Sequence, residues 1–303
     1  MSDVDLDAEK YEKHRQAGEI LAQVREEAAE RTEVGTGYLE ISEWAEARIR
    51  ELGDERGVPA EPAFPVNVSV DHEAAHGAAA PDDDREIGEE MVKLDIGVQI
   101  DGWLADTAVT VDFTGNDELV EAAVQALEAA LDVVEPGVHT GEIGAEIESV
   151  IDGYGYNPVV NLTGHGLGQW DQHTEPNIPN RAVDSGVELE VGDVVAVEPF
   201  ATDGGGKVTE GQQEEIYALE REASVRNRQA RQALEQIVEE FKTLPFARRW
   251  LDTSRAQMAL RRLEQQGVVH GYPVLQEDRG NLVSQREHTL IVTENGCEVT
   301  TRL

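Results

Sequence analysis

The chain has 303 residues, of which 40% are hydrophobic, so it can form one large domain or two ordinary ones and is not expected to be disordered. Its 25 basic and 62 acidic residues give a formal net charge of −37, which argues against wholesale nucleic-acid binding. The single cysteine, Cys297, excludes an intrachain disulfide and a cysteine-based zinc site, as expected for an intracellular protein.

The acidic residues are spread along the chain, and arginine supplies most of the cations. An acidic, lysine-poor surface suits a high-salt cytoplasm, so we expect a halophilic protein rather than an ordinary acidic one. The N-terminal residues lack the basic start and apolar core of a signal peptide, and no stretch approaches the ~20 apolar residues of a membrane span. We therefore expect a cytoplasmic location.

Two amphipathic helices are predicted at the start of the chain. Apolar residues recur at helical spacing from about Ala8 to Glu30 and from about Tyr38 to Leu52. Gly53 is the expected stop of the second helix, because glycine commonly follows a helix end. Both helices are expected to have structural roles.

A β-rich region follows these helices. The segment PAFPVNVSV (62–70) ends in alternating residues, and VKLDIGVQIDGWLADTAVTVDF (92–113) contains two β-rich runs around Asp101 and Gly102, the pairing signal of a hairpin. Helical patterns come next, at 116–134 and 140–153, and then a glycine-rich segment and the apolar run VVAVEPF (194–200). The chain is therefore expected to mix α and β structure throughout.

The last third is first helical and then β-rich. From about Ala223 to Gln266 the pattern is helical with a break at Pro245, and two apolar runs (268–274 and 281–283) flank the turn EDRG. Helices followed by a hairpin resemble a winged-helix arrangement. From 223 to 270 there are nine Arg or Lys and five Asp or Glu, a net charge of +4, which makes this the one basic region. The final segment, HTLIVTENGCEVTT, predicts a hairpin with the turn ENG.

Asp95 and Asp106 are the first candidates for chemistry. They lie in the two β-rich runs joined by a tight turn, so cross-strand pairing could bring their carboxylates together. Two buried carboxylates repel unless a cation lies between them. On these two residues alone, solvent-facing aspartates in a very acidic protein are an equally good interpretation.

Three further residues extend the candidate set. His165 lies in TGHGLG, where glycines allow close backbone approach and a neutral imidazole is a common metal ligand. Glu198 is embedded in an apolar run, and a buried carboxylate is costly unless a cation or donor compensates. Glu287 adds a fourth carboxylate. Such an oxygen-rich set can bridge two divalent ions, for which hydrolysis is the natural chemistry.

Five segments of the chain carry a resemblance to a known family. In chain order they are FPVNVSVDHEAAHG, KLDIGVQIDGWLADTAVTV, NLTGHGLGQWDQH, VEPFAT and SQREHT, and together they resemble the signature segments of the archaeal-type, type II methionine aminopeptidases of metallopeptidase family M24. The resemblance covers nearly the whole chain.

The resemblance implies an α+β pita-bread fold, that of the creatinases and aminopeptidases, with a metal site in the central cleft of two pseudo-symmetric halves. It implies one catalytic domain over residues 1–303, interrupted at about 212–280 by the helical, winged-helix-like insertion of type II members. The absence of a long charged N-terminal extension, as in archaeal members, is a further expectation.

The implied activity is removal of the N-terminal methionine from peptides and nascent proteins by a water that bridges two divalent metal ions. By position, the family's ligands match Asp95, Asp106, His165, Glu198 and Glu287, and the metals could be Co, Mn, Fe or Zn. Glu198 also matches the general base and acid.

The residues expected to contact the substrate are also implied by the resemblance. His76 matches a histidine near the scissile amide, His173 the histidine thought to stabilise the oxyanion, and Phe64 an aromatic residue of the methionine pocket. Unmatched, the two histidines would be ordinary surface residues. Gln172 stands where relatives commonly have an aliphatic residue, which affects the expected shape of the pocket.

Rival functions share the fold. A binding protein that has lost its ligands is disfavoured because all five ligand types are present, and prolidase or aminopeptidase P is disfavoured because the region before Phe64 is too short for their separate N-terminal domain. We expect a monomer without DNA or membrane partners. A basic patch with Arg248, Arg249, Arg261 and Arg262 could dock on ribosomal RNA, and ion pairing of these arginines with the acidic body is the alternative.

Overall fold

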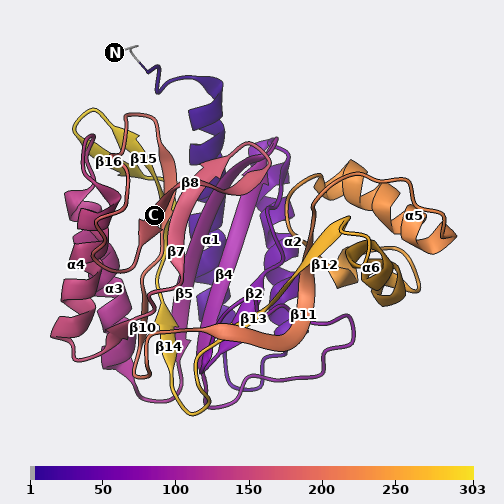
Figure 1. Ribbon diagram of the computed structural model, residues 1–303, viewed down its shortest axis with the longest axis horizontal. Coiled ribbons are helices and arrows are strands. Elements are labelled where there is room, and N and C mark those ends of the chain that lie inside the picture. Colours follow the sequence, from indigo (N-terminus) through magenta and orange to yellow (C-terminus); the bar gives the residue numbers. More distant parts are fainter. Residues whose placement is uncertain (1–3) are drawn as a thin grey trace.

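The computed structural model describes residues 4–303. In its N-terminal half, two long helices cover one face of an antiparallel sheet (Figure 1). The helices are α1 (Glu9–Arg31) and α2 (Tyr38–Arg56). The sheet has the order β1-β4-β2, with β5 paired to β4. Its strands are β1 (Ala60–Pro62), β2 (Asn67–Val70), β4 (Met91–Ile100) and β5 (Trp103–Asp112). Apolar residues from both helices and β4 form one core.

The β4–β5 hairpin is confirmed at the predicted turn. Asp101 and Gly102 both have positive φ, at 51° and 85°, which two-residue hairpin turns require. All ten residues of each strand are paired, from Met91 opposite Asp112 to Ile100 opposite Trp103. This continuous register fixes which side chains of the hairpin share a face.

The second half repeats the plan of a helix pair over antiparallel strands. Helices α3 (Asp117–Val133) and α4 (Thr140–Gly153) confirm the two predicted helices and form a second core with the strands. The larger sheet has the order β16-β15-β9-β7-β8. Its strands are β7 (Thr163–Gly168), β8 (Asp171–Pro179), β9 (Val194–Val197), β15 (His288–Thr293) and β16 (Gly296–Val299). A smaller sheet joins β6 (Asn157–Pro158), β10 (Phe200–Thr202) and β14 (Val283–Gln285).

Side-chain hydrogen bonds join the two halves between β5 and β15. The Thr107 hydroxyl donates to the carbonyl of Glu287 at 2.6 Å, and the Thr289 hydroxyl donates to the carbonyl of Asp106 at 2.8 Å. These bonds hold the strand that carries Asp106 against the chain segment that carries Glu287.

A third unit lies to one side of the two halves, at the right of Figure 1. Helices α5 (Arg228–Gln236) and α6 (Ala256–Glu264) pack together around their own apolar cluster, drawn from residues 217–269. A π turn (Ile237–Phe241) and a 3-10 turn (Arg248–Trp250) lie between them. The unit is joined to the sheet β12-β11-β13-β3, made of β3 (Glu73–Ala75), β11 (Thr209–Leu219), β12 (Phe246–Ala247) and β13 (Val269–Gln276).

The predicted hairpin across the EDRG turn is wrong. Strand β13 pairs with β11 and β3, whereas β14 pairs with β10 in another sheet. The two flanks of the turn bond instead to the loop after β2, because Glu277 N–H donates to the carbonyl of His72 and Val283 N–H donates to that of Asp71. The hairpin expected for a winged-helix arrangement is therefore not formed by β13 and β14, although helices α5 and α6 are present.

Two smaller expectations also need correction. Gly53 does not end α2, which continues to Arg56 and is followed by Gly57 with φ of 72°. A Cβ on Gly53 would lie 2.8 Å from the Cβ of Ala60, so this glycine instead permits the close approach of β1. The predicted C-terminal hairpin is confirmed, with β15 paired to β16.

The four arginines of the expected basic patch divide into two groups. Arg248 forms an ion pair with Glu215, and Arg249 forms one with Glu46. Arg249 therefore follows the alternative interpretation, ion pairing with the body, whereas Arg248 pairs with a residue of β11 inside the expected insertion. Arg261 and Arg262 lie exposed in the last turn of α6. Among residues 4–303, none of the helices has the length and apolarity needed to cross a membrane.

Candidate metal centre and substrate pocket

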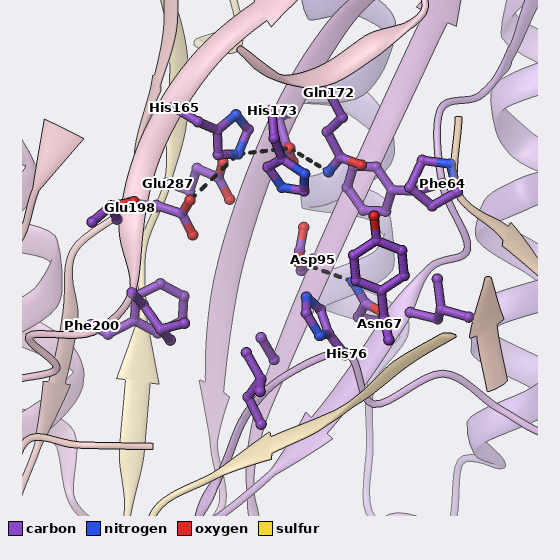
Figure 2. Close-up of a pocket in the computed structure, with 18 of the residues that line it drawn as sticks. Phe64, Asn67, His76, Asp95, His165, Gln172, His173, Glu198, Phe200 and Glu287 are labelled. Atoms are coloured by element: carbon purple, nitrogen blue, oxygen red, sulfur yellow. Dashed lines mark hydrogen bonds and ion pairs between the residues drawn. The ribbon is translucent and has the colours of Figure 1, made fainter. Parts of the chain in front are cut away.

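A pocket of about 260 Å³ lies where the two halves and the lateral unit meet. All eight residues predicted as site residues line it, and Figure 2 labels all of them except Asp106. They are Phe64, His76, Asp95, Asp106, His165, His173, Glu198 and Glu287. Residues far apart in the sequence therefore converge on one cavity.

The β4–β5 hairpin places two carboxylates on the same face. Asp95 lies opposite Ala108 and Asp106 lies opposite Gly97, so the two aspartates are diagonal neighbours across the strands. Asp95 Oδ2 accepts a hydrogen bond of 3.0 Å from the amide of Asn67, whose strand pairs with the other edge of β4. The register of the hairpin and its neighbour thus orients Asp95.

Two glycines allow His165 to reach the same site from β7. A Cβ on Gly164 would lie 2.3 Å from the carbonyl oxygen of Ala196, and one on Gly166 would lie 2.4 Å from that of Glu175. Bulkier residues would therefore push β7 away from its neighbouring strands. The ring Nδ1 of His165 is 3.3 Å from the carbonyl of Gly166, so it donates there and leaves Nε2 as an acceptor.

His165 is neutral in this structure. Burial, followed by the charge of His173, lowers its pKa to about 3. Its Nε2 lies 3.5 Å from Glu198 Oε1 and 3.9 Å from Asp106 Oδ2, distances that would suit ion pairs if the ring were protonated. Because the ring is neutral, its lone pair points at carboxylates, an arrangement typical of ligands around a cation.

Glu198 and Glu287 complete the group from two connecting segments. Glu198 directly follows β9, and its side chain is 14% exposed toward the pocket. Glu287 lies between β14 and β15 and is almost fully buried. The nearest ligand atoms of Asp106, His165 and Glu287 all lie within 4.8 Å of one another.

The carboxylates repel one another, and a cation is needed for all of them to be ionised together. Burial first, and then repulsion from their neighbours, raises the pKa of Asp106, Glu198 and Glu287 well above the usual range. Within residues 4–303, Asp95 Oδ1, Asp106 Oδ1 and Glu287 Oε1 are buried and accept no hydrogen bond. Buried acceptors of this kind are costly unless a ligand satisfies them, and divalent metal ions fit this donor set.

Two further histidines stand beside the carboxylates. His76 has a positive φ of 65°. Its Nδ1 lies 3.1 Å from the carbonyl of Pro273, so the ring proton of the neutral form is on Nδ1 and Nε2 is an acceptor. Burial lowers its pKa to about 4. His173, on β8, packs edge-on against His165 with 4.4 Å between ring centroids. Both rings can therefore meet a ligand in the pocket.

The pocket wall beside the metal centre is built around Phe64. A Cβ on Gly97 would lie 2.2 Å from the Phe64 ring, so the absence of a side chain at Gly97 lets the ring lie close against β4, where Gly97 pairs with Asp106. The amide of Gln172 donates a hydrogen bond of 3.2 Å to Asp106 Oδ2. The position that departs from the family pattern thus contacts a predicted metal ligand directly.

Sequence reasoning missed several lining residues. Asn67 carried a usable signal, since it is a polar residue in the alternating run PVNVSV and points to the same face as Asp95. Ile216, Pro245 and Tyr272 had none, because the lateral unit brings them to the pocket through tertiary contacts.

Comparison with known proteins places the chain in a family. The model of metallopeptidase family M24 matches residues 12–294. The methionine aminopeptidase of Archaeoglobus fulgidus is 49% identical over 298 residues, which are 98% of this chain and 100% of the relative. That of Methanocaldococcus jannaschii is 41% identical over 98% of this chain and 100% of its own length.

Solved structures share the fold at low identity. A thermophilic Arx1 superimposes with a TM-score of 0.87 at 20% identity, covering 99% of this chain and 92% of that one. The methionine aminopeptidase of Thermotoga maritima has a TM-score of 0.69 at 22% identity and covers 96% of both chains. The architecture is therefore the α+β pita-bread fold.

Proposed function

This chain belongs to the archaeal-type methionine aminopeptidases of metallopeptidase family M24, and from that premise we propose how its pocket removes the N-terminal methionine of peptides and nascent chains. The observation that carries the proposal is the buried group of carboxylates around His165, three of whose oxygens lack a partner within residues 4–303. A peptide N-terminus can enter the adjoining pocket, because His76, His173 and Phe64 all line it.

We assign five residues to hold two divalent ions. They are Asp95, Asp106, His165, Glu198 and Glu287. Four carboxylates in one buried group exceed the charge of a single divalent ion, which supports a site for two. When bound, Co, Mn, Fe or Zn ions would supply an acidified water and polarise the scissile carbonyl.

Glu198 is our candidate for the proton carrier. Burial, and then the charges of Asp106 and Asp95, raise its pKa above that of an ordinary glutamate, which favours a role in accepting and returning a proton. Its partial exposure toward the pocket lets it reach both the attacking water and the leaving amine. In this role Glu198 takes the proton from the water and returns it to the new N-terminus.

The two histidines act on the substrate. His76 keeps a hydrogen on Nδ1 for the carbonyl of Pro273, so its Nε2 accepts from the scissile amide N–H. We assign His173, at the pocket rim and against His165, to donate to the oxyanion that develops on the carbonyl.

Selection of methionine is assigned to the apolar part of the pocket. Phe64, Ile216 and Pro245 are buried and line it, and an unbranched thioether side chain fits a wall of this kind. Gln172 contributes the polar exception, and its amide faces Asp106 rather than the apolar wall.

Substitutions separate these roles. We expect Glu198→Gln to keep the fold and lose most turnover, and His173→Ala to depress turnover while metal binding persists. Turnover on Met-Ala-Ser and bound metal per chain, measured for both variants, check the assignment. Wild-type turnover in both variants would remove the proposed roles.

The rival functions have less support. A binding-only protein would not need five metal-ligating residues lining one pocket. A prolidase-like activity is disfavoured because two methionine aminopeptidases match this chain over their full length.

A contact with ribosomal RNA remains a second proposal. Arg261 and Arg262 are exposed on the basic insertion, and Arg248 and Arg249 are not part of it, since both are paired internally. The double substitution Arg261→Glu/Arg262→Glu should reduce cosedimentation with ribosomes at the working salt. Equal cosedimentation of variant and wild type would contradict the proposal.

A further inference from the structure

One wall of the substrate pocket combines residues from the N-terminal half and from the lateral unit with its sheet. Phe64 belongs to the N-terminal half, whereas Ile216, Pro245 and Tyr272 come from the lateral unit and its sheet. Phe64 shares an apolar cluster with Leu244, the residue before Pro245. The dimensions of the pocket therefore depend on how the lateral unit is held against the N-terminal half.

One buried carboxylate bonds to both parts. Glu46, on α2, accepts hydrogen bonds from the guanidinium of Arg249 and, at 2.9 Å, from the indole N–H of Trp250, both in the lateral unit. The same carboxylate is 3.4 Å from the backbone N–H of Val66, between Phe64 and Asn67. The side chains of Glu46 and Arg249 are only 6% and 5% exposed.

The contact lies next to the pocket without being part of it. Arg249 follows Pro245 by four residues, and Val66 lies two residues after Phe64 and directly before Asn67, the partner of Asp95. Neither Glu46 nor Arg249 lines the pocket. Any effect they have on the substrate must act through the residues that they position.

The segment that carries Pro245 is fixed at its other end as well. The Thr243 hydroxyl donates to the carbonyl of Trp170, and Lys242 Nζ lies 3.4 Å from the Trp170 ring centroid. Residues 242–250 are thus anchored to the turn between β7 and β8 and to α2. Pro245 itself lies between Leu244, which packs in the cluster of Phe64, and Phe246, which pairs with β11.

Burial distinguishes the Glu46 contact from the surface ion pairs of the lateral unit. Arg231 and Glu235, 3.8 Å apart, are 54% and 70% exposed and contribute little. Removing one partner of a buried pair leaves the other charge uncompensated, which is strongly destabilising, whereas removing both charges together costs less. We therefore expect the buried Glu46–Arg249 pair to stay closed in the folded protein.

We propose that Glu46 and Arg249 are positioning residues that fix the pocket wall of the lateral unit relative to Phe64 and thereby set the preference for methionine. The proposal rests on the proposed function of the pocket. An apolar pocket discriminates between side chains that differ by one methylene by about 10 to 200-fold in kcat/KM. We expect this discrimination to require that the wall of the pocket stays in place. With the contact opened, the pocket widens and accepts branched side chains.

The test compares kcat/KM for Met-Ala-Ser and Leu-Ala-Ser. In Glu46→Gln and in Arg249→Met we expect the methionine-to-leucine ratio to fall about tenfold, mainly through a higher KM for the methionine peptide. The double variant Glu46→Gln/Arg249→Met should fall by less than the product of the single effects, because the two changes remove one interaction. Glu43→Gln removes an exposed charge from the same helix and should leave the ratio unchanged.

A purely structural role predicts a different pattern. Loss of folded protein lowers the rates for both peptides equally and leaves their ratio intact, so an unchanged ratio in folded Glu46→Gln and Arg249→Met would overturn the proposal. If those variants do not fold, Trp250→Phe removes only the indole donor to Glu46 and should still lower the ratio. An unchanged ratio in Trp250→Phe would then count against the proposal.

A second readout does not depend on activity. Hydrogen exchange of peptides covering residues 63–70 should accelerate in Arg249→Met, although that substitution lies in the lateral unit, because Val66 N–H is held by the same carboxylate. If exchange of residues 63–70 accelerates in Arg249→Met but the wild-type protein releases no methionine, the result would contradict the proposed function and support the positioning role. If the wild-type protein is active, but Arg249→Met changes neither the exchange of residues 63–70 nor the methionine-to-leucine ratio of kcat/KM, the result would contradict the positioning role alone.

Discussion

In the metal-free protein, the protonation of Glu198 and its neighbouring carboxylates is linked to the stability of the fold. The carboxylates around it have raised pKa values because burial disfavours their charged forms. A raised folded-state pKa means that stability is fully present below the unfolded value and is lost as pH rises through the folded value. Metal-free protein should therefore lose stability on going from acid toward neutral pH because of these groups.

Replacement of Glu198 by glutamine removes one of the repelling charges. We expect metal-free Glu198→Gln to have a higher Tm than metal-free wild type near neutral pH, and the difference to shrink toward about pH 4, where the carboxyls are protonated in both. Calorimetry of chelator-treated proteins over this range measures it. A lower Tm for the variant at neutral pH would argue against repulsion in the site.

Gln172 acts on the metal centre through Asp106. Its amide donates to Asp106 Oδ2, and such outer contacts typically change metal affinity by about 10 to 100-fold when removed. We expect Gln172→Leu to weaken binding of Mn or Co about tenfold at fixed pH, as titration calorimetry would record. Unchanged affinity would mean that the hydrogen bond does not orient the ligand.

At the scale of elements, the β4–β5 hairpin is the part of the site that the sequence predicted best. Its strands, its turn at Asp101 and Gly102 and the shared face of the two aspartates all follow from local pattern and register. The EDRG hairpin had a similar local pattern and was wrong, because backbone groups after β2 compete for its flanks. Local signals predict elements, whereas the pairing of distant strands depends on tertiary contacts.

The same limit applies to the site. The five residues predicted as metal ligands, which line one pocket, were predicted from acidic and histidine residues in unusual settings and from family resemblance. Tyr272 and Pro245 could not be found in this way, since each is ordinary in its own segment and reaches the pocket only through the packing of the lateral unit.

Gly97 links the hairpin to the substrate wall. Gly97→Ala should displace the Phe64 ring, which lies 2.2 Å from the Cβ position, and raise KM for methionyl peptides several-fold while metal binding stays near wild type. Gly153→Ala, where nothing lies within 4 Å, is the matched control. Steady-state kinetics of both variants provide the check, and equal KM values would show that the ring tolerates the methyl group.

At the scale of the whole molecule, a net charge of −37 dominates the response to salt. Self-repulsion among exposed acids opposes the compact state, and salt screens it, with a Debye length of about 10 Å at 0.1 M and about 3 Å at 1 M. We propose that the protein is adapted to high salt, and we expect Tm to rise between 0.1 M and 2 M KCl. A Tm that is flat or falls over this range would contradict that adaptation.

The central claim is that the buried carboxylates work through divalent metal ions to release methionine. The direct measurement is free methionine released from Met-Ala-Ser by metal-free protein in high salt, before and after addition of Co or Mn, with the N-acetylated peptide as control. We predict no release without metal, release after addition, and none from the acetylated peptide. Undiminished release by metal-free protein, or no release from folded protein with either metal, would contradict the claim.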